Sequence, residues 1–236
     1  MNNIDHFIGS FDNFQQYWKE NTEEEIHKSK SGDIHRHLHI KVSKKGEREL
    51  KISIYEGRNN EKHLSEHYVF LDDPKTQIDS NRIATSEGEL TLENDVLGVN
   101  GFGIDIDGMI ESYQLMRCRY FSGWIEYPNP EDDTDVYRIG NLSLHDQGGA
   151  IQLDLEGIEY TVELTQLVFA HTIKIMKLAI YDLPMSQLEI NSKAISYTWT
   201  TPEAKRLGIN LRKIISGWTF IEEGMVNSDT MKEGEK

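Results

Sequence analysis

The chain has 236 residues, with 25 Lys and Arg against 40 Asp and Glu, which gives a formal net charge of −15. Such a charge argues against nucleic acid or an anionic membrane surface as a partner, because few cations are present to replace phosphate counterions. With 37% hydrophobic residues, the composition is that of a globular protein with a sizeable core. Cys118 is the single cysteine, so an internal disulfide is excluded and a reducing compartment is expected.

The chain shows no feature of a secreted or membrane-spanning protein. Its first residues (MNNIDHFIGSFDNF) lack the basic and apolar regions of a secretory signal. The most apolar stretch, residues 164–183, is interrupted by His171, Lys174, Lys177 and Asp182, so we expect no membrane span there. These features predict a soluble, cytoplasmic protein without a membrane partner.

One helix is expected near the start of the chain. It covers Phe14–His27, after Asp12 or Asn13, either of which can cap it by accepting a backbone N–H. A turn at Ser29–Asp33 is expected to end the helix. From there on, the hydrophobic period changes from a helical one to two residues, which is typical of β-strands.

Two alternating segments follow, His35–Val42 and Glu49–Tyr55, with a hairpin loop expected between them at Lys44–Glu47. In the first segment, the aliphatic side chains alternate with histidines and so face the opposite side. Further strand-like runs cover residues 67–71, 89–93, 119–127, 136–145, 150–155, 159–169, 174–182, 194–200 and 214–221.

This pattern predicts an all-β, mainly antiparallel barrel or sandwich with one short N-terminal helix. The absence of long helices between strands excludes Rossmann and TIM-barrel designs. A helical turn is expected at Pro202–Leu207, and a hairpin turn at Asp146–Gly149, where no helix follows that could bind phosphate. No clear linker divides the chain, so we expect one domain over residues 1–236, with 224–236 as a flexible tail.

The sharpest local feature is the alternation of His35, His37 and His39, whose side chains would project to one side of a strand. Two such histidines can hold a metal ion if another strand supplies a third ligand. The same pattern also fits the polar lining of a ligand pocket or a solvated outer face. We assign no metal ligand from the pattern.

A second group of polar side chains stands at a strand end, in Tyr55-Glu56-Gly57-Arg58. These residues can supply a hydrogen-bond donor, a general acid or base, and a cation for an anionic group. The plainer interpretation is a strand that ends in a turn, with Gly57 at positive φ. Cys118, between two arginines, is reactive only if exposed, and burial is the commoner state of a free cysteine.

The first third of the chain resembles the opening of the T-type phycobiliprotein lyases (the CpcT/CpeT family). The similar residues lie within about residues 6–70 and are Phe7-x-Gly9-x-Phe11-Asp12-Asn13-x-x-Gln16, His35-x-His37-x-His39, Tyr55-Glu56-Gly57 and Tyr68-x-Phe70. This chain departs from the family in having Gly57-Arg58 after Glu56 in place of the expected Gln, and residues 117–223 align with nothing in the family.

The resemblance implies a lipocalin-like β-barrel that holds an open-chain tetrapyrrole, a phycobilin, and delivers it to a cysteine of a phycobiliprotein subunit. It implies a catalytic role for Glu56 and ligand binding by His37, Tyr55, Arg58 and Tyr68. Arg58 would pair with a propionate, and Glu56 would protonate or hydrogen-bond the pyrrole nitrogens. No cofactor beyond the phycobilin, as ligand or substrate, is expected.

Two other functions remain open from the sequence. One is a non-catalytic lipocalin-like binder of another small apolar molecule. The other is a metal-dependent barrel enzyme that uses His35, His37 and a remote carboxylate. Which side of the segment His35–Val42 faces the core bears on these functions. If Leu38 and Ile40 lie in a filled core, the histidines lie on the opposite face, which argues against both histidine-based sites.

Overall fold

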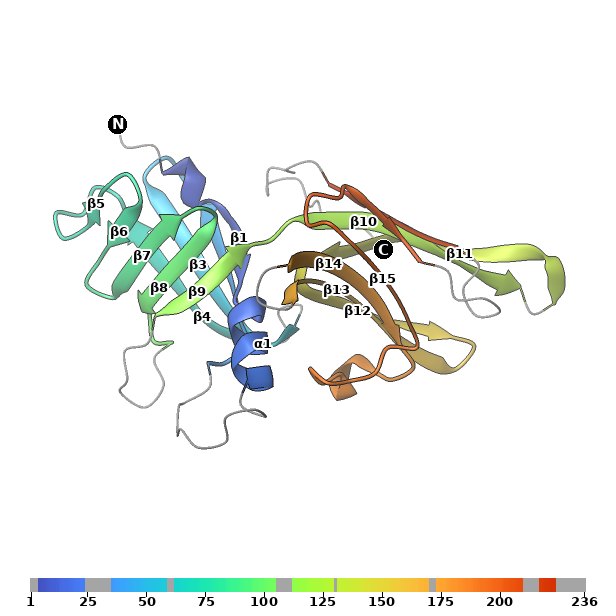
Figure 1. Ribbon diagram of the computed structural model, residues 1–236. Helices are drawn as coiled ribbons and strands as arrows, with labels where there is room; N and C mark the ends of the chain where they lie inside the picture. Colours follow the sequence, from blue (N-terminus) through green and yellow to red (C-terminus); the bar gives the residue numbers. More distant parts are fainter. Residues whose placement is uncertain are drawn as a thin grey trace. The chain divides into compact units, whose positions relative to one another are not determined.

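The structure, a computed structural model, describes residues 4–23, 35–58, 62–104, 112–129, 131–169, 173–209 and 217–223 (Figure 1). It is mostly antiparallel β-structure with a short N-terminal helix, α1 (Phe14–Glu23), so the predicted all-β fold class is confirmed. One sheet of nine strands curls into a half-barrel. No helix in the described residues has the length and apolar character needed to cross a membrane.

The described residues form two compact units, one that extends to Cys118 and one that begins at Arg119. Each is described here by itself. The expectation of a single domain over residues 1–236 stays a prediction, because compactness does not measure whether either unit folds alone. The expected tail, residues 224–236, lies outside the described residues.

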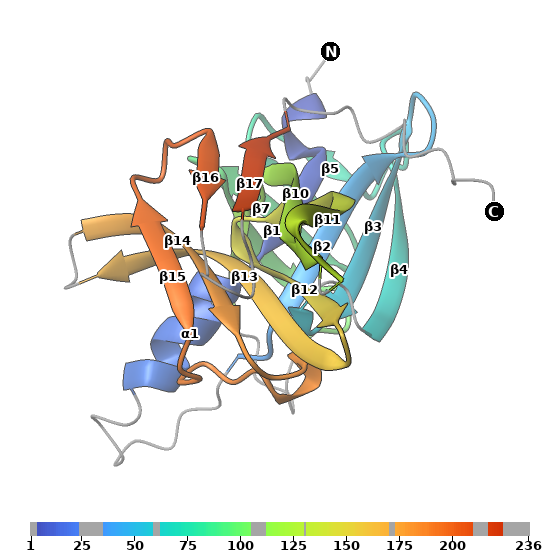
Figure 2. The same ribbon diagram turned by 90° about the vertical axis from the view of Figure 1, so that its right-hand side faces the viewer.

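The first unit contains a single curled antiparallel sheet, in which β2, β3 and β4 lie side by side (Figure 2). β1 pairs with both β2 and β9 and so joins the two halves of the sheet. The short 3-10 helix η1 (Asp5–Phe7) precedes it. In spatial order the strands are β4 (Lys62–Phe70), β3 (Glu49–Glu56), β2 (Leu38–Lys44), β1 (Gly9–Asp12), β9 (Tyr113–Arg117), β8 (Val96–Gly101), β7 (Gly88–Glu93), β6 (Arg82–Ala84) and β5 (Gln77–Ile78).

A continuous apolar core covers one face of this sheet. Leu38, Ile40 and Val42 of β2 are at most 1% exposed and pack with fully buried side chains from β1, β3, β7 and β8. Each such side chain contributes roughly 1.5–3 kcal/mol by leaving water. The aliphatic side of β2 is therefore its core face, and the histidines lie on the other side. They are nevertheless at most 9% exposed, so the expectation that a filled core argues against a histidine-based site does not hold.

The second unit has two four-stranded antiparallel sheets that share one core. Phe121 and Phe220 come from one sheet and Leu164 and Leu178 from the other. The first sheet is β11 (Asp132–His145), β10 (Tyr120–Asn129), β17 (Gly217–Glu222) and β16 (Arg206–Gly208). The second is β12 (Gln147–Leu155), β13 (Ile158–Phe169), β14 (Ile173–Tyr181) and β15 (Ser196–Thr200), with the 3-10 helix η3 (Met185–Gln187) before β15.

The expected hairpin turn at Asp146–Gly149 is wrong, because β11 and β12 on either side of it belong to different sheets. The fully buried Asp146 carboxylate fixes this corner. It accepts hydrogen bonds from the backbone N–H of Arg119 at 3.0 Å, from Arg119 Nε at 2.8 Å and from Gln166 Nε2 at 2.6 Å. Asp146 therefore stabilises the corner at which the chain passes from the sheet of β11 to the sheet of β12.

Several short elements differ from the sequence-based expectations. The expected helical turn at Pro202–Leu207 is wrong, since the chain makes a turn and then enters β16. The strands β1, β8 and β9 were not expected. Glycines interrupt the alternating pattern in β1 and β8, and β1 and β9 are too short to show a clear alternation. The loop before Glu49 is confirmed by a hydrogen bond from Lys45 N to Glu49 O at 2.9 Å. Residues 24–34, with the end of the expected helix and its turn, lie outside the described residues.

We expect Ile40→Ala to lower the free energy of unfolding by about 2–5 kcal/mol, because it removes methyl groups from a filled core. The matched control is Lys41→Ala, at the next position of the same strand, where the side chain is exposed. That change should stay within about 0.5 kcal/mol. Urea denaturation of both variants measures the difference, and similar losses would contradict the assignment of the core face.

Lys177 on β14 gives a pH-dependent prediction. Burial lowers the pKa of its amine from 10.5, so the folded state disfavours the charged form. The unfolded state binds more protons between the lowered pKa and 10.5, and stability therefore rises with pH across that window. We expect Lys177→Met to raise the Tm at pH 7, and this gain should shrink as the pH approaches 10.5. A thermal melt series tests this, with the exposed Lys174→Met as control.

Candidate functional site

The candidate site is centred on Asp12, at the junction of β1 and α1. Its Oδ1 accepts a hydrogen bond from the backbone N–H of Phe14 at 2.7 Å, in the first turn of the helix. This confirms the expected capping role, in which a side-chain oxygen satisfies a backbone donor that has no partner within the helix. The strand and the helix thus follow each other almost without a loop.

The same carboxylate contacts two of the three histidines. His37 Nε2 lies 2.8 Å from Asp12 Oδ1, and His39 Nδ1 lies 3.2 Å from Asp12 Oδ2. An ionised carboxylate only accepts hydrogen bonds, so each facing ring nitrogen carries a proton. Asp12 therefore fixes the orientation of both imidazoles and the tautomer that each neutral ring adopts.

His35 is held from α1 in a different way. Glu20 accepts from the His35 backbone N–H at 2.9 Å and lies 2.8 Å from its Nδ1. Asn13 adds two bonds, accepting from Leu38 N at 2.7 Å and donating to Arg36 O at 2.8 Å. The start of α1 is therefore tied to the segment that enters β2 by side-chain bonds.

Aromatic rings surround His37. The Tyr17 ring stacks on it with centroids 5.3 Å apart and an interplanar angle of 11°, and the Phe14 ring packs against it at 5.7 Å. The guanidinium of Arg58, itself buried, lies 5.4 Å from the centroid of Phe14. The structure thus places the predicted ligand-binding residues His37 and Arg58 against the same phenyl ring.

A row of polar side chains crosses the sheet from Asp12 on the face away from the core. Asp12, His39, Tyr55 and His63 are consecutive cross-strand partners on β1, β2, β3 and β4. The His39 and Tyr55 rings have centroids 6.4 Å apart, and the Tyr55 and His63 rings 5.2 Å. We call these four residues the outer-face row. Predicted residue Tyr55 is part of it.

The outer-face row continues to a charged group on β3 and β4. His63 Nε2 lies 3.7 Å from Glu66 Oε1, and the Tyr68 hydroxyl donates to Glu66 Oε2 at 3.1 Å. A hydrogen bond from Lys51 lowers the pKa of Glu66, and the same bond raises the pKa of Lys51. Both groups are therefore ionised at neutral pH. Predicted residue Tyr68 is 37% exposed at this end.

Glu56, the predicted catalytic residue, lies on the other face of the sheet from Tyr55. Its cross-strand partner is the core residue Leu38, and partners in an antiparallel pair share a face. Its carboxylate is 3.0 Å from Lys62 Nζ and 3.9 Å from Arg36 Nη1. The predicted acid therefore lies on the opposite face of the sheet from Tyr55 and Tyr68. Gly57 has the expected positive φ, 87°.

The two alternatives that used histidines or cysteine are constrained by these contacts. Glu20 and Asp12 lie 2.8 Å from one ring nitrogen each of His35 and His37. A metal ion held by these two histidines would therefore have to use the other nitrogen of each ring. Cys118 is buried, as the commoner behaviour of a free cysteine predicts. Sequence reasoning did not find the roles of Asp12, Tyr17 and Glu20 in the site, because they depend on strand register and helix packing.

Comparisons with known proteins add no relative. No model of a known protein family matches the sequence, and no curated protein matches it. No solved structure matches this fold either. The resemblance to the T-type lyases therefore rests on the residues within positions 6–70 alone.

We expect Asp12→Ala to lower the free energy of unfolding by on the order of 3 kcal/mol, because it leaves one backbone and two imidazole N–H groups without their acceptor. Asp12→Asn, which keeps one acceptor oxygen, should cost less. The matched control is Asp5→Ala, where an exposed carboxylate pairs with Lys44 at 3.2 Å and contributes little. Chemical denaturation compares the three variants. Equal losses for Asp12→Ala and Asp5→Ala would contradict the bridging role.

Proposed function

We propose that this chain binds an open-chain tetrapyrrole and delivers it to a cysteine of a phycobiliprotein subunit, as the T-type lyases that it resembles do. The observation that carries the proposal is the arrangement around His37. Asp12, from the motif shared with that family, bonds to His37, which stacks on Tyr17 and packs against Phe14 beside Arg58. These are the residue types that a conjugated, anionic ligand requires.

Each of these groups has a role in the proposed binding. The Arg58 guanidinium pairs with a propionate of the tetrapyrrole through charge-assisted hydrogen bonds. The rings of Tyr55 and Tyr68 provide aromatic surface for the pyrroles, and His37 contributes a polar edge. Glu56, at the end of β3, keeps its proposed role as the acid or base toward a ligand that extends to that end of the sheet.

The proposed transfer needs little chemistry from the protein. The thiol of the partner's cysteine adds across a carbon–carbon double bond of the ligand: a carbon–sulfur bond forms, and the thiol proton ends on the neighbouring carbon. No oxidant or reductant is consumed. The contribution of this chain is to orient the ligand and to shield it from other reactions.

A non-catalytic binder of another small apolar molecule is the second candidate, and one observation favours it. Glu56 lies on the opposite face from Tyr55 and is engaged by Lys62 and Arg36. An acid on the other face of the sheet from a ligand-binding residue is compatible with binding but gives no support to catalysis. In this case the ligand would bind and leave unchanged.

Titration of the purified chain with phycocyanobilin and with phycoerythrobilin, followed by absorbance and fluorescence, tests the proposal. We expect saturable binding of one ligand with a red shift and increased fluorescence. Arg58→Gln should weaken binding about tenfold, because a charge-assisted bond is worth about 1.5 kcal/mol. The matched control is Arg48→Gln, at an arginine whose side chain is 75% exposed, and this change should leave the affinity unaltered.

The outcomes separate the two candidates. No spectral change with either bilin would exclude tetrapyrrole binding. If bilin binds, mixing the complex with an apo-phycobiliprotein subunit and measuring covalent attachment decides whether transfer occurs. Glu56→Gln should then reduce the transfer rate more than the affinity. Binding without any transfer would leave a carrier that does not catalyse attachment.

A further inference from the structure

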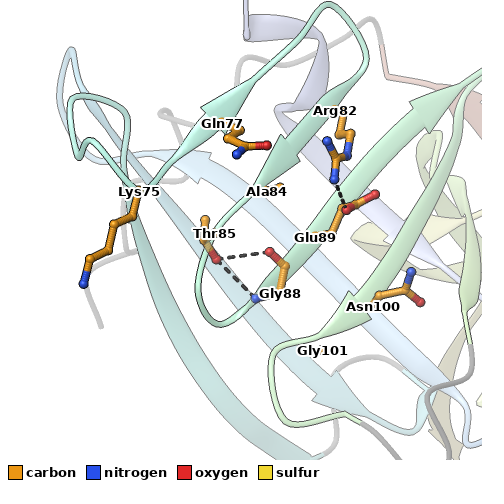
Figure 3. Close-up of a pocket in the computed structure, with 9 residues that line it drawn as sticks. All are labelled: Lys75, Gln77, Arg82, Ala84, Thr85, Gly88, Glu89, Asn100 and Gly101. Carbon is orange, nitrogen blue, oxygen red and sulfur yellow. Dashed lines mark hydrogen bonds and ion pairs between the residues drawn. The ribbon is translucent and has the colours of Figure 1, made fainter.

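A polar pocket of about 450 Å³ opens on the strands β5 to β8 of the first unit (Figure 3). Its lining residues all lie outside residues 6–70, so neither the resemblance nor the proposed tetrapyrrole site involves them. Its volume is within the range of roughly 300–1,000 Å³ that is usual for small-molecule sites. The lining consists of Lys75, Gln77, Arg82, Ala84, Thr85, Gly88, Glu89, Asn100 and Gly101.

The alternation of the strands directs polar side chains into this pocket. Ile83 of β6 and Leu90 of β7 are fully buried in the core. Their neighbours Arg82, Ala84 and Glu89 therefore face the other side of the sheet, where the pocket lies. The site is thus backed by the rigid apolar core of the unit, which keeps its strands in place.

A cross-strand pair of glycines shapes the floor. Gly88 of β7 pairs with Gly101 of β8, whose φ is +75°. A Cβ atom on Gly88 would lie 2.5 Å from the backbone oxygen of Asn100 and 2.6 Å from the Phe102 ring. Any larger residue at position 88 would therefore collide with its surroundings. Because Phe102 belongs to the core, these glycines allow the close packing of β7 and β8 beneath the pocket.

An ion pair forms part of the lining. Arg82 Nη2 donates to Glu89 Oε2 at 2.7 Å, and Figure 3 shows the two side chains meeting between β6 and β7. This hydrogen bond lowers the pKa of Glu89 and raises the pKa of Arg82, so both stay ionised at neutral pH. Lys75 stands at the margin with its amine directed away from the pair (Figure 3).

Asn100 contributes a polar atom that the protein itself does not satisfy. Its Oδ1 is buried and has no hydrogen-bond partner. A buried acceptor without a donor costs about 1–3 kcal/mol. Because this oxygen has no surface open to solvent, a ligand hydroxyl can donate to it only after the amide turns toward the pocket. The Thr85 hydroxyl is already satisfied, because it donates to the Gly88 carbonyl and accepts from the Gly88 backbone N–H. Asn100 is therefore a lining residue that still has a hydrogen bond to make, once its amide faces the ligand.

We propose that this pocket binds a small neutral polyhydroxylated molecule, of the size of a mono- or disaccharide, through Asn100 and the Arg82–Glu89 pair. The polar lining gives no support to an apolar ligand. The charges of Arg82 and Glu89 compensate each other, so the pair gives no net attraction for a simple anion or cation. Hydroxyl groups both donate and accept, so one ligand can donate to Asn100 Oδ1 and to Glu89 while it accepts from the guanidinium.

Titration of the full chain with glucose, galactose, mannose, maltose, lactose and trehalose, followed by ¹H–¹⁵N correlation spectra, tests this site. We expect at least one sugar to cause saturable shifts with a millimolar Kd. The shifted amides should be those of Gly88, Glu89, Asn100 and Gly101. Inorganic phosphate and glycine betaine serve as an anionic and a zwitterionic probe, and neither should produce a saturable shift at these amides.

Two variants locate the binding. Asn100→Leu should weaken the sugar at least tenfold, since it removes the buried acceptor. Ala84→Phe should abolish binding by filling the space, without the loss of any hydrogen bond. The matched control, Asn81→Ala, alters an asparagine on the neighbouring turn outside the pocket and should leave the Kd unchanged. The spectra themselves show whether each variant is folded.

Three results would overturn the assignment. The first is the absence of saturable shifts with every sugar. The second is tighter binding of phosphate or betaine than of any sugar. The third is an equal loss of binding in Asn81→Ala and Asn100→Leu, or shifts that fall outside β5 to β8.

Discussion

The first unit depends on the carboxylate of Asp12, which accepts three hydrogen bonds at once. Its partners are the Phe14 backbone at 2.7 Å, His37 at 2.8 Å and His39 at 3.2 Å. These three bonds join the start of α1, the segment before β2 and β2 itself. The position of the helix on the sheet, the stacking of Tyr17 on His37 and the tautomers of the imidazoles all follow from this one buried group.

A second constraint is the period of two residues along β2, which assigns every side chain to a face. Once Ile40 is in the core, His39 must lie on the opposite face, and the outer-face row across β1 to β4 follows from the pairing register. The same rule places the consecutive residues Tyr55 and Glu56 on different faces. Their adjacency in the sequence therefore does not bring them together in one site.

The sequence predicts those parts of the fold whose signal is local. β3 and β13 were expected because their alternation is clean, and the hairpin loop before Glu49 because turn residues separate two such runs. β8 was missed because Gly98 and Gly101 interrupt its pattern. The turn at Asp146 was misassigned because what it does is set by its buried contact with Arg119, 27 residues away in the sequence.

The candidate site could be predicted only in part for the same reason. His37, Tyr55, Arg58 and Tyr68 were singled out by the resemblance to the T-type lyases. The structure places His37 and Arg58 beside Phe14 at the start of α1, and Tyr55 and Tyr68 along β3 and β4. Asp12 was recognised as a helix cap, which is a local role. Its bonds to His37 and His39 require the register between β1 and β2 and the packing of the helix, and no local pattern contains that information.

The two proposed ligand sites differ in which hydrogen-bonding groups the protein leaves unsatisfied. At Asp12, both carboxylate oxygens already accept bonds from imidazole rings, so a tetrapyrrole gains most from the exposed edges of the aromatic side chains and from Arg58. In the pocket on β5 to β8, the buried Oδ1 of Asn100 still needs a donor, and a ligand hydroxyl can provide it once the amide turns toward the pocket. A preorganised cluster favours a ligand of matching shape, whereas an unsatisfied acceptor favours a ligand by its hydrogen-bonding groups. The chemical selectivity of the two sites should therefore be independent, even though both are built on the same sheet and the same core.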